Sequence, residues 1–98
     1  MAVVRRTPEA LRDLEDVHRF LSRSSPMAAN STVERLLDTA DRLGDFPELG
    51  TVVSELSRSR YRQVVVGAYR LFYRFDSDAV FMGGIVSARR RLRPGDLN

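Results

Sequence analysis

The densest concentration of chemical functionality in the chain is a run of arginines close to residue 93. Four of the five residues from 89 to 93 are arginine, namely Arg89, Arg90, Arg91 and Arg93. The planar guanidinium group binds a carboxylate or a phosphate through two parallel hydrogen bonds. The run therefore indicates binding to a phosphate backbone or to an acidic protein surface, and a solvated chain end is the alternative.

A second set of arginines belongs to a segment with the two-residue period of a β-strand. Residues 69–75 read Tyr-Arg-Leu-Phe-Tyr-Arg-Phe, so Arg70, Phe72 and Arg74 share one face. We expect Leu71 and Phe75 to be buried on the other face, which leaves the arginines and Phe72 on an open face. Such a face can bind phosphate and stack a base. The alternative is that Arg70 and Arg74 pair with glutamate or aspartate from the helices or are freely solvated.

Residues suited to acid–base or nucleophilic catalysis are scarce. The chain has no cysteine and one histidine, His18, which falls in a helical segment without a second histidine. Catalysis of either kind needs a base or nucleophile with an oriented partner. The helix carboxylates Glu9, Asp13 and Asp16 are interpreted as a solvated face, and no phosphate-binding glycine loop or serine nucleophile motif occurs. We therefore expect no metal site and no cofactor.

Two helices must position these arginines. Each begins with a capping hydroxyl followed by proline, at Thr7-Pro8 and at Ser25-Pro26, a combination typical of helix N-termini. Apolar residues at three- and four-residue spacing then predict helices over 8–22 and 26–43, with Gly44 as the terminating residue. The connector of about four residues predicts an antiparallel helical hairpin.

Strands surround this hairpin in the sequence. A short strand is predicted at residues 3–6, a turn at 45–50 and a surface loop at 51–59, followed by strands over 61–66, 69–75 and 79–86. Gly67-Ala68 predicts a type II′ turn, and Gly83-Gly84 predicts a bulge or a close backbone approach. The expected fold is therefore α+β, with a short N-terminal strand and an antiparallel helical hairpin packed on a small antiparallel sheet, in the order β-α-α-β-β-β.

Composition divides the chain into two electrostatic halves. All 16 basic residues are arginine, and against 13 acidic residues they give a net charge of +3. Residues 1–57 hold seven arginines and ten acidic residues, whereas residues 58–93 hold nine arginines and two aspartates. This asymmetry indicates an acidic partner for the second half. No apolar stretch approaches the roughly 20 residues of a membrane span, and no leader pattern precedes Pro8, so we expect a cytoplasmic protein.

Five motifs and their order resemble the ParE/RelE toxin superfamily of type II toxin–antitoxin systems. They are Ala-Leu-x-Asp-Leu-Glu-Asp at 10–16, Asp-Phe-Pro-Glu-Leu-Gly at 45–50, Tyr-Arg at 61–62, Gly-x-Tyr-Arg-Leu-x-Tyr-Arg at 67–74 and Ala-Arg-Arg-Arg at 88–91. The resemblance spans essentially the whole chain and implies one toxin domain over 1–98. In this superfamily, RelE-like members are ribosome-dependent ribonucleases that cut mRNA, whereas ParE-like members poison DNA gyrase. A cognate antitoxin neutralises either kind by wrapping the toxin.

The residues that match the ribonuclease members are incomplete in this sequence. Arg70 matches their phosphate-binding arginine, Arg62 lies where the preceding strand offers a cation, and Arg89 or Arg90 matches the basic position after the last strand. Val64 stands where a second cation would face the same way as Arg62. No tyrosine or histidine follows the last strand to act as acid or base, so the resemblance favours a ParE-like toxin.

The resemblance thus implies a growth-inhibiting toxin that binds DNA gyrase and is held inactive by a cognate antitoxin. The assembly that it suggests is a toxin–antitoxin heterotetramer or a larger complex. The alternative is a ribosome-dependent mRNA endoribonuclease that uses Arg62, Arg70 and Arg90. A third interpretation is a degenerate member that only binds its antitoxin. The residues predicted to contact the target or the antitoxin are Arg70, Phe72, Arg74, Arg89, Arg90, Arg91 and Arg93.

Overall fold

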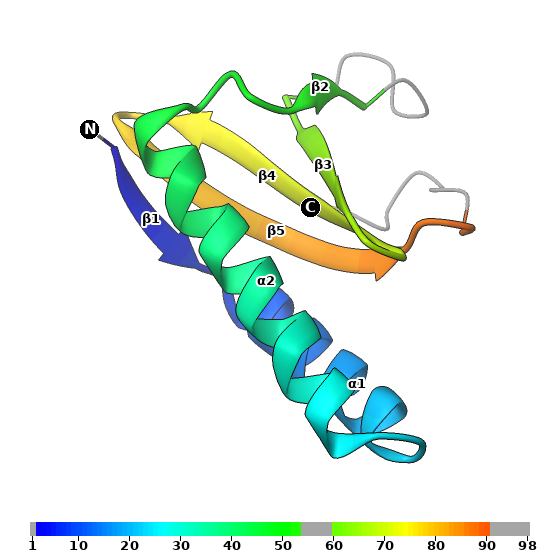
Figure 1. Ribbon diagram of the computed structural model, residues 1–98. Coiled ribbons are helices and arrows are strands. Elements are labelled where there is room, and N and C mark those ends of the chain that lie inside the picture. The colour runs from blue at the N-terminus through cyan, green and yellow to red at the C-terminus, as the bar shows by residue number, and fades with distance from the viewer. Residues whose placement is uncertain (1, 54–59, 91–98) are drawn as a thin grey trace.

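A computed structural model of the chain describes residues 2–53 and 60–90 (Figure 1). The elements follow the order β-α-α-β-β-β-β, one strand more than the sequence predicts. They are β1 (Val3–Arg6), α1 (Pro8–Ser22), α2 (Pro26–Asp45), β2 (Thr51–Val52), β3 (Arg62–Val66), β4 (Tyr69–Asp76) and β5 (Ala79–Ser87). The predicted α+β class is confirmed. The added strand, β2, lies within the segment that the sequence predicts as a loop, of which residues 54–59 are outside the described ranges.

The strands form one mixed sheet in the order β1-β5-β4-β3-β2. Strands β2 to β5 are antiparallel neighbours, as their short connections require. The edge strand β1 instead pairs in parallel with β5, from Val3 opposite Ala79 to Arg6 opposite Met82. The expectation of a wholly antiparallel sheet is therefore wrong at this edge. No tight turn joins β1 to β5, so connectivity does not impose an antiparallel pairing there.

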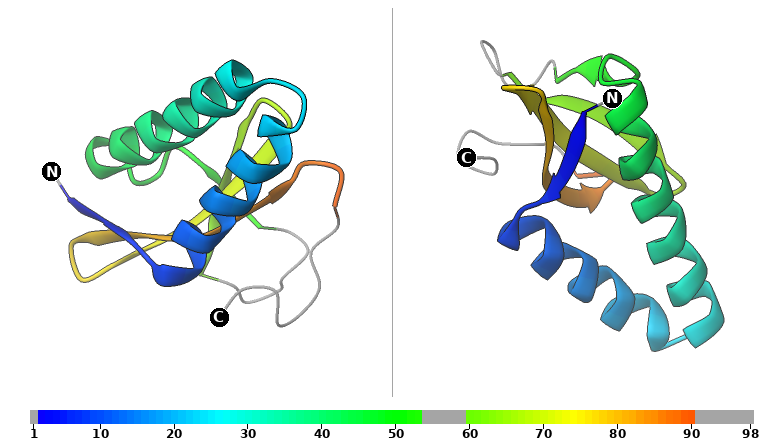
Figure 2. Two further views of the ribbon diagram at one scale, coloured as in Figure 1. Left: turned by 90° about the horizontal axis from the view of Figure 1, so that it is seen from below. Right: turned by 90° about the vertical axis from the view of Figure 1, so that its left-hand side faces the viewer.

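Both helices begin at the predicted caps. The Thr7 hydroxyl accepts a hydrogen bond from the amide of Ala10 at 3.2 Å, and the Ser25 hydroxyl accepts one from Ala28 at 3.1 Å. Each cap satisfies an amide that has no partner within its helix, and proline follows at the first helical position. The helices lie on one side of the sheet, and their connection extends beyond it (Figures 1 and 2).

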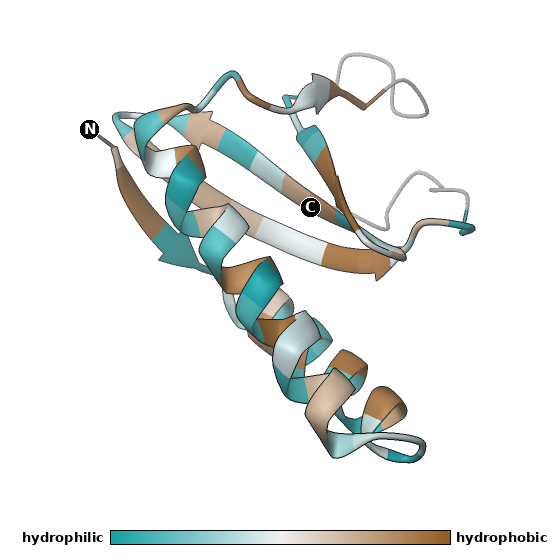
Figure 3. Cartoon of the chain, in the orientation of Figure 1, coloured by the Kyte–Doolittle hydropathy of each residue, from teal (hydrophilic) through white to brown (hydrophobic). Residues whose placement is uncertain are grey.

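The main core lies between this hairpin and the facing side of the sheet. Bands of teal and brown alternate along the helices in Figure 3, as expected of elements with one apolar side. Apolar positions of both helices supply this core, although Phe20 and Met27 near the connection of the helices are exposed. The buried residues of this core are Ala10, Leu14, Val17, Leu36, Ala40, Leu43, Val66, Leu71, Tyr73, Val80, Met82 and Ile85.

Gly44 lies within α2 and does not terminate it as the sequence predicts. A Cβ atom added at this position would lie 2.7 Å from the backbone oxygen of Ala2 and 3.0 Å from Cγ2 of Val4. The amide of Ala2 also donates a hydrogen bond to the Gly44 carbonyl at 2.7 Å. The glycine therefore allows the backbone that leads into β1 to approach the helix closely, and the helix continues to Asp45.

The glycines of the sheet agree with the sequence-based expectations. Gly67 has a φ of 59° in the turn between β3 and β4, and Ala68 does not have a positive φ, which fits the predicted type II′ turn. The pairing of β4 with β5 is irregular between Phe72 and Tyr73, so Gly83 is the extra residue of a bulge. Its missing side chain leaves room for the ring of Tyr61, whose Cε1 atom would lie 2.5 Å from an added Cβ.

The hydroxyl of Tyr73 fixes the turn between α2 and β2. It donates a hydrogen bond to the Pro47 carbonyl at 2.7 Å and accepts one from the Gly50 amide at 2.8 Å. Arg62 donates to the Gly50 carbonyl at 2.8 Å. Burial of the phenol raises the pKa of Tyr73, which keeps the hydroxyl protonated and able to donate. The Phe-Pro-Glu-Leu-Gly segment is therefore attached to the core by a tyrosine 23 residues beyond Gly50.

A carboxylate from α1 completes the free edge of β5. The pairing of β5 with β1 ends at Met82. Three residues farther along β5, the amide of Ile85 donates a hydrogen bond to Oδ2 of Asp13 at 2.9 Å. Burial raises the pKa of Asp13, and the hydrogen bond from Ile85 opposes this shift. The interpretation of Asp13 as part of a solvated helix face is therefore wrong, because it satisfies a backbone donor that would otherwise lack a partner.

We expect Tyr73→Phe to lower the free energy of unfolding by about 2 kcal/mol, because leaving a buried donor or acceptor unsatisfied costs roughly 1–3 kcal/mol. The measurement is urea unfolding followed by circular dichroism. Tyr69→Phe is the matched control, because that tyrosine is half-buried at the start of β4 and packs against the core through its ring. Equal stability of the two variants would contradict the role assigned to the Tyr73 hydroxyl.

We expect Asp13→Asn to raise stability at neutral pH, because the amide oxygen still accepts from Ile85 without burying a charge. The folded pKa lies above the unfolded value of 3.8, so the folded chain binds more protons between these two values. The ionised carboxylate therefore costs stability as the pH rises through that window. Urea unfolding should give equal stability of the variant and the original chain below pH 3.8, and an advantage of the variant above the window. Glu15→Gln, which removes a carboxylate from an exposed position of the same helix, is the matched control at neutral pH and should not raise stability.

Candidate target-binding surface

The face of the sheet that points away from the helical hairpin carries most of the predicted site residues, but it is not open. Phe72 is fully buried, in a second apolar cluster with Val53, Tyr61 and Val86. The expectation that Phe72 is exposed on an open face is therefore wrong. Alternation along β4 assigns Phe72 to this face correctly, but Val53 and Tyr61, on either side of residues 54–59, cover it. Its ring is packed away from solvent, where it is inaccessible to a stacking base.

Phe75 shows the opposite departure from expectation. It shares the core face with Tyr73, but 48% of its surface is exposed. Phe75 pairs with Val80 beside the turn that joins β4 to β5, so it lies at the end of the sheet. Strand alternation predicts the face correctly, whereas exposure depends on how far the helices extend along it.

Arg70 is the buried polar residue of this face, with 7% of its surface exposed. Its Nε donates to Oε1 of Gln63 on β3 at 2.7 Å, and its Nη1 donates to the carbonyl of Arg90 at 2.9 Å. The guanidinium carbon lies 4.9 Å from the centroid of the Phe72 ring, within the range of a cation–π contact. The prediction of a phosphate-accessible Arg70 on an open face is therefore wrong: the side chain is an internal hydrogen-bond donor.

Arg62, the third candidate for a ribonuclease site, contacts the protein backbone. Its Nη1 donates to the Gly50 carbonyl, on the same turn that Tyr73 holds. Arg62 and Arg70 both belong to the β3–β4 pair, but Arg62 is opposite Tyr73 and Arg70 is opposite Val65. The two guanidinium groups thus stabilise two separate connections of the fold.

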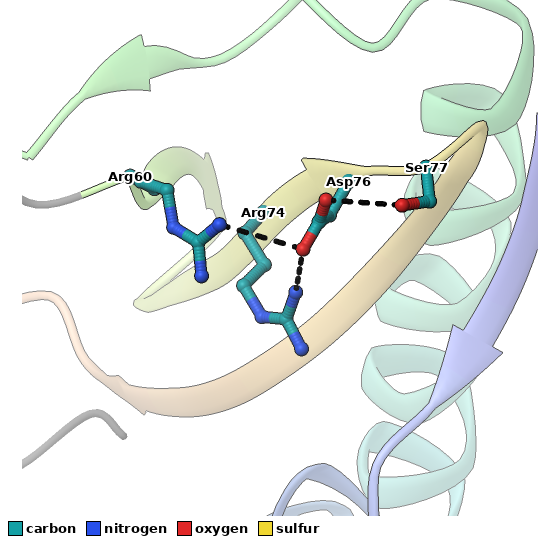
Figure 4. Close-up of polar contacts among 4 residues, drawn as sticks. All are labelled: Arg60, Arg74, Asp76 and Ser77. Atoms are coloured by element: carbon teal, nitrogen blue, oxygen red, sulfur yellow. Dashed lines mark hydrogen bonds and ion pairs between the residues drawn. The ribbon is translucent and has the colours of Figure 1, made fainter.

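Arg74 is the more accessible cation of β4, with 26% of its side chain exposed. Its Nη1 lies 3.1 Å from Oδ2 of Asp76, and Arg60 reaches the same oxygen at 3.4 Å. Figure 4 shows the two guanidinium groups converging on this carboxylate, whose other oxygen contacts Ser77. Arg74 also lies 4.3 Å from the centroid of the Phe81 ring. The sequence-based alternative is pairing with acidic residues of the helices, whereas the observed partner of Arg74, Asp76, belongs to β4 itself.

The arginine-rich run begins directly after β5. Arg89 and Arg90 are exposed. The Arg89 amide donates to the Ser87 hydroxyl at 3.3 Å, and the Arg90 amide donates to the Ser87 carbonyl at 3.0 Å. Arg91 and Arg93 lie outside the described residues. The described part of the run therefore starts in a turn whose backbone is fixed against the end of the sheet.

Two further residues of this face support Arg70 and Phe72. Gln63 accepts a hydrogen bond from Arg70, and the sequence indicates only that Gln63 lies on the same strand face as Val65. Tyr61 covers Phe72 and occupies the space left by Gly83, and the glycine bulge is the signal that predicts a close approach. Tyr61, Arg12, Asp13 and Arg74 also line a hollow of about 350 Å³ at the edge of β5.

His18 connects the two helices, at a distance in the fold from these arginines. Its Nε2 lies 2.8 Å from Oδ1 of Asn30, and its Nδ1 lies 3.4 Å from the Ser22 hydroxyl. In the ranges 2–53 and 60–90, no group of three histidine, cysteine or acidic side chains is arranged to hold a metal ion. Within the same ranges, neither helix has the length and apolar character needed to cross a membrane.

A larger groove of about 790 Å³ separates the helical hairpin from the β3–β4 turn and the end of β5. Apolar side chains from both helices and the sheet line it, and Arg89 and Asp16 place opposite charges at its rim. The lining residues that matter here are Val17, Phe20, Leu21, Val66, Tyr69 and Ala88. The groove therefore joins an apolar floor to the start of the arginine-rich run.

Comparisons with known proteins place the chain in a family. Residues 4–92 match the family described as "ParE toxin of type II toxin-antitoxin system, parDE". The chain is 33% identical over 78 residues to "Toxin RelE3" of Caulobacter vibrioides, and the match covers 80% of this chain and 85% of that protein.

Two solved structures are also similar. The chromosomal ParDE toxin–antitoxin system from P. aeruginosa has a TM-score of 0.74 at 16% identity, covering 89% of this chain and 96% of that one. The RelBE2 toxin–antitoxin complex from Mycobacterium tuberculosis has a TM-score of 0.64 at 22% identity, covering 88% and 96%. At these identities the two structures establish the fold.

Proposed function

The chain belongs to the ParE toxin family of type II toxin–antitoxin systems, and from this premise we propose that it inhibits DNA gyrase by binding it. A cognate antitoxin holds it inactive by direct contact. The family match supports the toxin assignment over residues 4–92. The target is the finer part of the proposal, and it depends on how the arginines of the sheet are used.

The observation that carries the choice of target is the internal use of Arg62 and Arg70. A ribonuclease of this fold needs cations free to hold the scissile phosphate and a group to move protons. Here Arg62 donates to the backbone of Gly50, and Arg70 is buried with donors directed at Gln63 and Arg90. His18 contacts Asn30 on the helical hairpin. This arrangement favours a toxin that acts by binding over one that cleaves.

The name of the Caulobacter relative, Toxin RelE3, is the observation that favours the alternative, a ribosome-dependent mRNA endoribonuclease. Tyr61 also lies half-buried on the same sheet face as Arg74, and a phenol is one of the groups that act as general acid or base. The two candidate functions differ in the process that stops first in cells, so a single experiment separates them.

The antitoxin is proposed to cover the apolar surface that the toxin leaves exposed and to carry acidic residues opposite the basic half. Phe20 and Met27 are 62% and 79% exposed near the end of the helical hairpin, and Phe20 lines the large groove. Large apolar side chains that are exposed close to one another are typical of interfaces with other proteins. Acidic residues of the partner would complement Arg89 at the rim of the groove.

Expression of the chain alone should stop DNA synthesis before protein synthesis and should trap gyrase on cleaved DNA. The measurements are pulse labelling of both polymers after induction, and supercoiling by purified gyrase with added toxin. Arg5→Gln removes an exposed positive charge from β1, away from the arginine-rich run, and the variant should still inhibit gyrase. Early loss of translation with cut messages would replace the gyrase proposal with the ribonuclease. Unimpaired growth at verified expression would indicate a member that only binds antitoxin.

We also expect the association rate of toxin and antitoxin to fall steeply as salt increases, because attraction between a basic and an acidic surface accelerates encounter and is screened by ions. Stopped-flow or surface-based kinetics between about 50 and 500 mM salt would measure it, a range over which the Debye length falls severalfold. An association rate that does not depend on salt would contradict the acidic partner surface.

A further inference from the structure

Arg70 is more deeply buried than any other charged residue among those that the structure describes. A buried guanidinium is costly unless its donors are used. Two of its donors reach acceptors that are far apart in sequence: the side chain of Gln63 on β3 and the backbone carbonyl of Arg90 after β5. One side chain on β4 therefore joins the strand before it to the segment that follows the last strand.

The contact with Arg90 is one of several that fix the chain as it leaves the sheet. The amide of Ala88 donates to the carbonyl of Ala68, in the β3–β4 turn, at 2.8 Å. The Arg90 amide donates to the Ser87 carbonyl, and the Arg90 carbonyl accepts a hydrogen bond from Arg70. Of these contacts, the one from Arg70 is the only one made by a buried, charged side chain, and charge-assisted hydrogen bonds are the stronger kind.

We propose that Arg70 is a positioning residue, whose guanidinium fixes the Arg90 carbonyl and so holds Arg89 and Arg90, the described start of the arginine-rich run, against the end of the sheet. Arg70 does not itself touch the target. The inference rests on the proposed function, and it adds that the run, which the sequence predicts to contact the target or the antitoxin, binds the target. A run that leaves the sheet at a fixed point loses less conformational freedom on binding than a freely moving one.

Trypsin tests the clamp directly, because the carbonyl that Arg70 holds belongs to the bond that trypsin would cut after Arg90. The protease must draw this carbonyl into its own hydrogen bonds, so the contact with Arg70 should slow cleavage. We expect Arg70→Met to raise the initial rate of cleavage after Arg90 at least about tenfold, measured by mass spectrometry on the full chain. A tenfold change equals about 1.4 kcal/mol, which is close to the lower end of the range for a hydrogen bond to a charged group.

Two controls separate a local effect from loss of the fold. Cleavage after Arg35, in the middle of α2, should not change, because it reports unfolding of the whole domain. Arg74→Met removes a cation from the same strand face without touching Arg90, so it should leave cleavage after Arg90 unchanged. If Arg70→Met does not fold, Gln63→Leu provides a milder test. It removes one acceptor and should raise the rate in the same direction by a smaller factor.

Inhibition of gyrase by purified protein tests the positioning role. Arg70→Lys keeps the charge but loses the planar group that reaches both acceptors. We expect faster cleavage after Arg90 and at least a fivefold loss of inhibition, while cleavage after Arg35 stays as slow as in the original chain and so shows that the domain remains folded.

Unchanged cleavage in every variant would overturn the clamp. Faster cleavage with full inhibition would overturn the positioning role, provided that the variant in which Arg89, Arg91 and Arg93 are all changed to glutamine no longer inhibits gyrase. If that triple replacement also leaves inhibition intact, the failure lies in the proposed function of the run, and the inference drawn from it fails with it.

Discussion

The burial of β4 on both faces is the constraint on which the rest of the structure depends. On one face Leu71 and Tyr73 pack under the helical hairpin, and on the other Phe72 and Arg70 are covered by residues of β3, β5 and the segment around β2. A strand enclosed in this way must satisfy every polar group that it carries inside. Tyr73 does so by holding the turn at 46–50, and Arg70 does so by holding Gln63 and Arg90. The two buried polar side chains of one central strand, Arg70 and Tyr73, thereby fix two distant connections.

Local patterns predict the parts of this fold that local physics controls. A hydroxyl followed by proline gives both helix starts to the residue, because the capping bonds span only three positions. The turn at Gly67 and the bulge at Gly83 follow from what glycine permits. By contrast, a glycine at position 44 is typical of a helix end. The close approach of Ala2 and Val4, which are distant in sequence, explains why it lies inside α2 instead.

The candidate site is less predictable, because alternation assigns a residue to a face but does not reveal what covers that face. Arg70 and Phe72 are on the predicted side of β4, yet the covering residues Val53 and Tyr61 come from a region without a regular pattern. The arginine inventory suggests many cations for an anionic target. The structure divides them into internal donors, such as Arg62 and Arg70, and exposed cations, such as Arg89 and Arg90. This division needs the acceptors Gly50, Gln63 and Arg90, which no local motif predicts.

The parallel pairing of β1 with β5 has a consequence for the order in which the molecule acquires its shape. Val3 is opposite Ala79, and the hydroxyl of Thr7 donates to the carbonyl of Met82, 75 residues away. Contacts of such long separation form late, because much of the chain must be in place first. During synthesis, the first strand cannot find its neighbour until residues 79–82 have been made and have left the ribosome tunnel. Strand β1 is thus locked in place only after its partner strand has been made, although it precedes every other element that the structure describes.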